Sequence, residues 1–129
     1  MITEDYVSFE TAKLLKEKGF DEECSCFYDN IVDYVTPGLE VDGQLYYKNS
    51  FLDDEEYAAP TLQMAMKWLR EKHNISIEPL VDFGSGNECW WSVDVAYIKK
   101  NGLIDELCGY NSYEEACEAA IKYYLENLI

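Results

Sequence analysis

The sequence predicts a single α+β domain: an antiparallel sheet of three to five strands, ending in a three-stranded meander, packed with three α-helices. Three segments show helical spacing of apolar residues between recognisable helix ends, and the stretch between the second and third alternates apolar and polar residues. The chain has 129 residues, which fit one domain, and 48% of them are apolar, which suffices for a core. The expected order over residues 1–129 is therefore α-(ββ)-α-βββ-α.

The first helix is predicted over residues 8–18 by the residues at its two ends. Ser8 can cap the free amide groups of the first turn, and Gly19 supplies the left-handed conformation that closes a helix. Phe20 follows at the position where a side chain folds back on the last turn, here on Leu15.

The second helix is predicted over residues 60–73. Pro60 suits a first turn, because the amide proton that it lacks has no partner there, and Asn74 suits a left-handed stop. The apolar residues at helical spacing are Leu62, Ala65, Met66 and Leu69.

The third helix, residues 113–127, begins with a capping box. Ser112 and Glu115 are spaced so that each side chain accepts a hydrogen bond from the backbone amide of the other residue. The apolar residues of this helix cover a wide surface, which indicates contacts on more than one side. Self-association as a homodimer through this helix therefore stays open.

Three strands are predicted between the second and third helices. Their approximate ranges are residues 75–83, 91–97 and 103–110. Pro79 lacks an amide donor, which places the first strand at a sheet edge or a bulge. Asn101-Gly102 predicts a tight hairpin between the other two strands, which would set Val95 opposite Cys108. The result is an antiparallel meander.

The segment between the first two helices is predicted to hold two strands and an acidic loop. The strands cover residues 26–35 and 41–48, the second with a bend at residues 42–43, and Thr36-Pro37-Gly38 forms a turn between them. The loop over residues 51–56 ends in four consecutive acids. Residues 19–59 hold eleven acidic residues and one basic residue, so most of the negative charge lies here.

The charge of the whole chain is strongly negative: 26 acidic against 10 basic residues, for a net charge of −16. Such an excess repels nucleic acid and anionic membranes, and it attracts basic proteins or imitates the acidic polymer that they bind. Five cysteines without framework spacing favour reduced thiols. No signal peptide or apolar run of about 20 residues is present, so we expect a cytoplasmic protein with no direct nucleic-acid or membrane contact.

Several segments of the chain resemble a group of small proteins of uncharacterised function encoded by phages and prophages of gut anaerobic bacteria. The segments are residues 8–20, 59–71, 113–116 and 124–129. The resemblance covers all three helices and implies a phage or mobile-element origin. It implies no catalytic residues.

No combination of residues predicts a catalytic or metal site. His73 is the single histidine, and near the end of a helix it more often stabilises the helix dipole than acts as a base. Cys24 and Cys26 are the one close thiol pair, whereas structural zinc usually takes four ligands from two paired motifs. We therefore expect buried cysteines, no metal and no cofactor.

Two other segments resemble ligand-binding loops only superficially. The acids from Asp53 to Glu56 lack the ligand spacing and central glycine of an EF-hand loop. Gly84-Ser85-Gly86 lacks the lysine of a phosphate-binding loop and predicts a plain turn. Trp90 and Trp91 are neighbours in a strand, so one ring can face the core while the other faces out, unless both are covered.

These observations favour a non-enzymatic protein that binds a basic or nucleic-acid-binding protein, as a DNA mimic or as an immunity-type inhibitor. The alternative is a small enzyme that uses carboxylates, or a sugar binder with a site lined by Trp and Tyr. Because interfaces favour Trp and Tyr, the candidate partner surface combines aromatic and acidic residues. Its members are Tyr46, Tyr47, Asp53, Asp54, Glu55, Glu56, Trp90 and Trp91.

Overall fold

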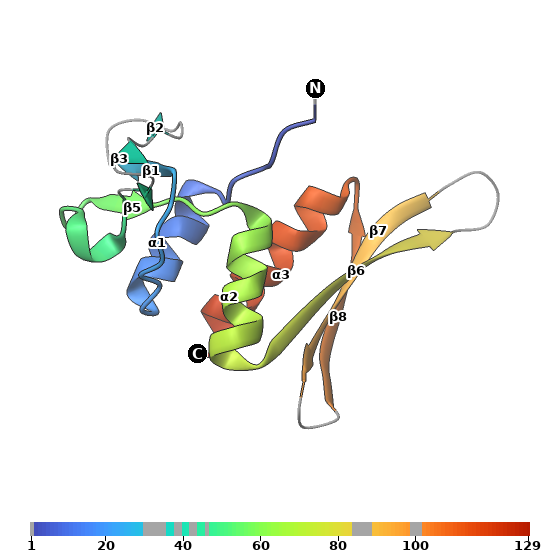
Figure 1. Cartoon of the computed structure of the whole chain (residues 1–129). Coiled ribbons are helices and arrows are strands. Elements are labelled where there is room, and N and C mark those ends of the chain that lie inside the picture. The colour runs from blue at the N-terminus through green and yellow to red at the C-terminus, as the bar shows by residue number, and fades with distance from the viewer. Residues whose placement is uncertain are drawn as a thin grey trace. The chain divides into compact units, whose positions relative to one another are not determined.

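Over the residues that it describes, the computed structural model shows an α+β protein with three α-helices and antiparallel strands, which confirms the predicted class and order of elements (Figure 1). It describes residues 2–29, 36–37, 40–41, 44–45, 47–83, 89–98 and 102–129. The chain forms two compact units, the N-terminal unit Met1–Gln63 and the C-terminal unit Met64–Ile129. One domain over residues 1–129 stays a prediction.

Helix α1 (Phe9–Glu17) of the N-terminal unit has the predicted ends. The Ser8 hydroxyl accepts a hydrogen bond from the amide of Thr11 at 3.2 Å. Gly19 has a φ of 92°, and the Phe20 amide donates to the carbonyl oxygen of Leu15 at 2.9 Å. These bonds satisfy backbone groups that a helix end otherwise leaves without partners.

The N-terminal unit contains a three-stranded antiparallel sheet in the order β2-β1-β5. Its strands are β1 (Cys26–Asp29), β2 (Thr36–Pro37) and β5 (Glu56–Ala58). The predicted turn at Thr36 and Pro37 is wrong, because these residues pair with β1 as an edge strand, where a proline without an amide donor is tolerated. Glu56, expected in the acidic loop, begins β5.

The strand predicted over residues 41–48 is in fact part of a short hairpin. Strand β3 (Glu40–Val41) pairs with β4 (Gln44–Leu45), with Val41 opposite Gln44. Only two residues separate that pair, and Asp-Gly is a preferred hairpin dipeptide. Residues 30–35 and 42–43 themselves lie outside the described residues, as do the predicted turn at residues 84–86 and Asn101.

A buried asparagine joins three elements of the N-terminal unit. Asn49 begins the 3-10 helix η1 (Asn49–Phe51). Its side-chain amide donates to the carbonyl oxygen of Phe20 at 2.7 Å and accepts from the amide of Ala58 at 2.9 Å. The end of α1 and strand β5 are thereby tied to η1. Nearby, the Phe9 ring packs edge-on against Tyr28 and Tyr57.

Helix α2 (Leu62–His73) begins later than Pro60, where the sequence predicts its start. Thr61 forms a β-bridge with Tyr6 instead, and the first helical residue donates its amide to the carbonyl oxygen of Asp5 at 2.9 Å. These bonds hold the chain extended up to Thr61, so the helix starts only afterwards. At the other end Asn74 has a φ of 55°, which confirms the predicted left-handed stop.

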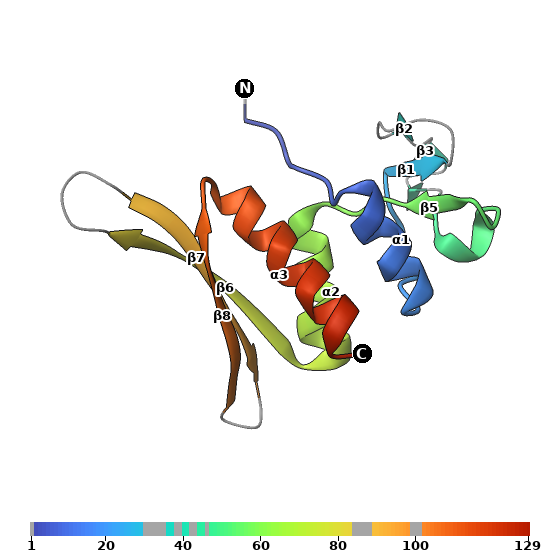
Figure 2. The ribbon, with the colours of Figure 1, turned by 180° about the vertical axis from the view of Figure 1, so that it is seen from behind.

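The C-terminal unit contains the predicted meander, with strand order β6-β7-β8. The strands are β6 (Ile75–Phe83), β7 (Cys89–Tyr97) and β8 (Gly102–Tyr110). Helix α3 (Tyr113–Asn127) contacts all three strands from one side (Figure 2). Pro79 lies in β6, which is an edge strand as predicted.

The predicted register between β7 and β8 is wrong. Val95 lies opposite Asp105 rather than Cys108, and Val93 lies opposite Leu107. This register turns a leucine toward the helix-covered face and leaves Cys108 exposed, which buries more apolar surface. The difference begins at the turn, because Tyr97 pairs with Gly102 and four residues separate the two strands. Bulges near Ile104 and near Gly109, whose φ is 88°, change the register further along β8.

Helix α3 begins at the predicted cap with one difference. The Ser112 hydroxyl accepts from the amide of Glu115 at 3.1 Å, as expected. The Glu115 carboxylate, however, accepts from the amide of Asn111 at 3.1 Å instead of from that of Ser112. The buried face of the helix comprises Ala116, Cys117, Ala120, Ile121, Tyr124 and Leu125.

Candidate functional site

The face of the β6-β7-β8 sheet opposite α3, here called the outer face, carries acidic and apolar side chains. Alternation places Ile75, Ile77, Val93 and Val95 on the covered face, where all four are buried. The residues between them face the other way. With their cross-strand partners, the members of the outer face are Ser76, Glu78, Leu80, Trp90, Ser92, Asp94, Ala96, Leu103 and Glu106.

Three carboxylates form a row across the outer face. Glu78 lies directly opposite Asp94, and Asp94 lies directly opposite Glu106. Neighbouring strands are about 4.8 Å apart, so each acid lies beside a like charge, which destabilises a sheet. Within the described part of the chain, no basic side chain forms a salt bridge with this row, here called the acid row. The row therefore presents a strong negative potential to solvent.

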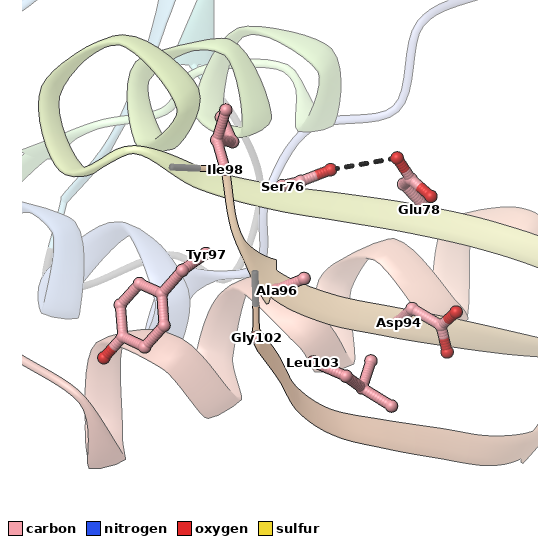
Figure 3. A pocket seen from close by; sticks show the side chains of 8 residues that line it. All are labelled: Ser76, Glu78, Asp94, Ala96, Tyr97, Ile98, Gly102 and Leu103. Carbon is pink, nitrogen blue, oxygen red and sulfur yellow. Dashed lines mark hydrogen bonds between the residues drawn. The ribbon is translucent and has the colours of Figure 1, made fainter. Parts of the chain in front are cut away.

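A depression of about 470 Å³ lies next to the acid row (Figure 3). Glu78 and Asp94 line one part of it, and Ser76 donates a hydrogen bond to the Glu78 carboxylate at 3.2 Å. Ile98 and Leu103 line the other part, and both are exposed. The depression thus places carboxylates beside apolar carbon, an arrangement that suits a ligand with both a positive charge and an aliphatic part.

The distal end of the β6–β7 hairpin exposes large apolar side chains on both of its faces. Phe83 is 83% exposed and Trp90 is 39% exposed, and Leu80 and Val81 are exposed beside them. Cross-strand pairing sets Phe83 opposite Cys89 and Val81 opposite Trp91. These four exposed residues are here called the hairpin end. An exposed apolar group of this kind is typical of an interaction surface.

The two neighbouring tryptophans have different environments. Trp91 packs edge-on against Tyr113 of α3, with ring centroids 5.5 Å apart. Trp90 points to the outer face and stays exposed. Of the two predicted arrangements, the structure thus has one ring held against a helix and the other available for contact.

The predicted partner surface is divided between the two units. Trp90 and Trp91 belong to the C-terminal unit, and the other described members belong to the N-terminal unit. Asp53, Asp54 and Glu55 are exposed, whereas Glu56 and Tyr47 are half-buried. The Tyr47 ring packs against Phe27 with centroids 4.6 Å apart, which makes it part of local packing. Tyr46 lies outside the described residues.

The residues from Asp53 to Glu56, here called the acidic turn, are held by one lysine of α1. The Lys16 ammonium group donates to the carbonyl oxygen of Asp53 at 2.7 Å and to that of Glu56 at 2.8 Å. It also lies over the Tyr57 ring, 5.3 Å from the centroid. Because the ammonium binds backbone oxygens, the carboxylates of Asp54 and Glu55 stay exposed to solvent.

The single histidine packs among aromatic rings. The His73 ring lies 4.8 Å from that of Trp68 and 5.9 Å from that of Tyr124, measured between centroids. Burial lowers the pKa of His73 from its usual value. Among the residues that the structure describes, no group of three or more His, Cys, Asp or Glu side chains is arranged to hold a metal ion.

Two of the described cysteines are neutral thiols held in the core. Burial raises the pKa of Cys24 to about 12 and that of Cys117 to about 11. A thiol is a weak nucleophile unless it ionises, so these side chains serve packing. Cys108, in contrast, is exposed on β8. In the described ranges no helix has the length and apolar character needed to cross a membrane.

Sequence reasoning missed most of the hairpin end. The sequence predicts only a strand for Leu80, Val81 and Phe83, although Leu80 and Val81 are consecutive and cannot both face α3. That pair is the signal for an apolar residue on the outer face.

Comparison of the chain with models of protein families, with curated protein sequences and with solved structures finds no match.

Proposed function

We propose that the chain is a non-enzymatic binding protein for a basic protein, such as one that itself binds nucleic acid. The observation that carries this proposal is the hairpin end, which exposes Trp90 on the same face as the acid row and Phe83 on the opposite face of the same sheet. In keeping with the phage or prophage origin that the sequence suggests, the partner is a protein of the bacterial cytoplasm.

The two features supply different parts of such an interaction. Exposed aromatic side chains are the residues from which interfaces draw most of their binding energy. The net charge of −16 and the acid row steer a basic partner toward the molecule and raise its rate of association. The contact is then completed by burial of Trp90 and Phe83.

Of the two versions of this function, the hairpin end favours an immunity-type inhibitor over a DNA mimic. A mimic of the phosphate backbone needs carboxylates alone, because phosphate contacts supply most of the affinity of nucleic-acid-binding proteins. A side chain as exposed as Phe83 adds nothing to such mimicry. It does fit an apolar pocket of one specific partner.

The alternative function, a carboxylate enzyme or a sugar binder, would use the depression on the outer face. Glu78 and Asp94 line that depression. Tyr97 also lines it, whereas Trp90 and Trp91, the tryptophans expected to line such a site, are not among its lining residues. The arrangement therefore supports the binding function better.

The test is capture of partner proteins from a lysate of the bacterium that carries the gene, with washes at about 50 mM and then about 500 mM salt. We expect a basic protein to be retained in the first wash and released in the second. Phe83→Ser combined with Trp90→Ala should abolish capture. The matched control is Phe51→Ser, which removes another exposed phenylalanine, in the N-terminal unit.

Two results would contradict the proposal. One is capture that persists at high salt, since charge steering is then unnecessary. The other is capture that the double variant and the Phe51→Ser control reduce equally, since the hairpin end is then not the contact surface.

A further inference from the structure

The two edges of the β6-β7-β8 sheet differ in their ability to accept another strand. Strand β6 carries Pro79 at its centre, and a proline offers no amide to a neighbouring strand. Strand β8 spans nine residues without a proline, and in the described part of the chain its one hydrogen-bonded neighbour is β7. The far edge of β8 thus keeps backbone donors and acceptors that no described strand uses. The Glu106 amide donates to the Asp105 carboxylate at 2.8 Å, so an added strand would have to replace that side-chain acceptor.

Strand β8 is also the least covered strand of this sheet. None of its nine residues is buried, whereas β6 and β7 both contain buried residues. Leu103, Glu106, Cys108 and Gly109 are exposed. A strand with this degree of exposure can be reached by an extended segment of another chain.

The charges on β8 specify what kind of strand it can accept. The strand carries two acids, Asp105 and Glu106, and no base. The Asp105 carboxylate interacts with the hydroxyl of Tyr123 on α3, and that hydrogen bond raises the pKa of Tyr123. Glu106 points to the outer face, where it ends the acid row at the edge of the sheet. A strand added to β8 would place a side chain directly opposite Glu106 and so continue the row.

A second copy of this chain would be a poor occupant of that position. Antiparallel pairing of β8 with β8 of another copy would bring their two acids close together, and like charges in facing strands are destabilising. A lysine or arginine opposite Glu106, in contrast, would relieve the repulsion that the three carboxylates of the acid row exert on one another. Pairing of β8 with β8 of a second copy is therefore unfavourable, whereas pairing with a basic strand is favourable.

We propose that β8 is the docking edge of this protein: an extended basic segment of the partner pairs with it as a fourth strand, with a lysine or arginine opposite Glu106. This rests on the proposed function and adds the geometry of binding. Main-chain hydrogen bonds supply the affinity, and the charge opposite Glu106 supplies selectivity.

The test uses a synthetic peptide of about nine residues, the length of β8, in which lysine alternates with valine or threonine. A second peptide has the same sequence with every second backbone nitrogen methylated, which removes donors along one edge without changing the charge. We expect the methylated peptide to bind the full chain about tenfold more weakly at low salt. The unmethylated peptide should also protect amides of β8 from hydrogen exchange.

Two charge reversals complete the experiment. Glu106→Lys should weaken binding of the unmethylated peptide by about tenfold, and Glu106→Gln should weaken it less. Asp54→Lys, the matched change in the acidic turn, should alter the affinity for the unmethylated peptide by about twofold or less, because it changes only the overall electrostatic potential of the protein. Circular dichroism of each variant confirms that it is folded.

The possible outcomes distinguish failure of strand pairing at β8 from failure of the proposed binding function. Equal binding of the two peptides, or no detectable binding of either, overturns edge pairing. If partner capture from the lysate still needs the hairpin end in that case, the proposed function stands without the edge. If capture is also insensitive to salt and to the hairpin end, both proposals fail.

Discussion

The Lys16 ammonium group lies 2.7 Å from the carbonyl oxygen of Asp53 and holds the acidic turn against α1. The same group binds the carbonyl oxygen of Glu56 at 2.8 Å, so one side chain fixes both ends of the turn. Among the described residues, both of these hydrogen-bond acceptors of the lysine are backbone oxygens and neither is a carboxylate, although the turn that it binds is acidic. Its effect is to order the backbone while leaving the acids exposed.

Lys16→Met should therefore loosen the acidic turn. The methionine keeps the aliphatic stem and loses both charge-assisted hydrogen bonds, which we expect to cost about 1 kcal/mol of unfolding free energy. Urea denaturation measures the loss, and hydrogen exchange should show faster exchange over residues 53–56. The control is Lys13→Met, an exposed lysine on the same helix, which should leave both measurements unchanged.

Asn49→Ala should destabilise the N-terminal unit by about 2 kcal/mol, because it leaves the buried amide of Ala58 and the carbonyl oxygen of Phe20 without this partner. Urea denaturation followed by circular dichroism measures it. Asn127→Ala is the comparison, since Asn127 bonds a backbone carbonyl at an exposed position. Equal losses of unfolding free energy in the two variants would show that the buried hydrogen bonds of Asn49 stabilise the protein no more than an exposed one does.

Gly109→Ala should cost about 1–2 kcal/mol through the backbone alone. Gly109 has a φ of 88°, and a β-carbon there would meet no atom within 4 Å, so steric crowding plays no part. Thermal denaturation gives the change in Tm. Gly109→Asn should cost less, because asparagine tolerates positive φ. Cys108→Ala, at the exposed neighbour, should leave Tm unchanged; an equal drop there would point to side-chain loss instead.

His73 should make the protein less stable in mild acid. Its pKa is lowered in the folded state by burial, so the folded protein binds a proton less readily than the unfolded chain. The free energy of unfolding that neutral His73 contributes is fully present above the pKa of the histidine in the unfolded chain, about 6.5. It is lost as the pH falls through the pKa of His73 in the folded protein. His73→Phe keeps a ring between Trp68 and Tyr124 and removes this dependence. Urea midpoints of both proteins at pH about 7.5 and 5.5 give the comparison; parallel shifts would rule the effect out.

The helix ends could be predicted because their signals are local. Ser8, Gly19, Asn74 and Ser112 each act on backbone groups within a few residues, and each does so in the structure. The start of α2 could not be predicted in this way. It depends on Asp5 and on residues near it, which lie more than 50 positions away in the sequence.

In the candidate site, too, the features that depend on distant residues could not be predicted from the sequence. Alternation left two arrangements open, with one tryptophan facing out or both covered, and in the structure Trp90 is exposed. The acid row could not be predicted, because it depends on the register of three strands, and the register that pairs Asp94 with Glu106 follows from the pairing of Tyr97 with Gly102 and from a bulge near Ile104. A two-residue Asn101-Gly102 turn predicts a different register, because it places Gly102 in the turn, whereas in the structure Gly102 begins β8 and pairs with Tyr97.

Pro79 has a consequence for the size of any assembly. Polymerisation through sheet edges requires two competent edges on every molecule, so that each added copy offers a new end. This sheet offers one, since the proline interrupts the other. A strand bound at β8 therefore leaves this sheet with the β6 edge alone, where Pro79 disfavours the addition of another copy.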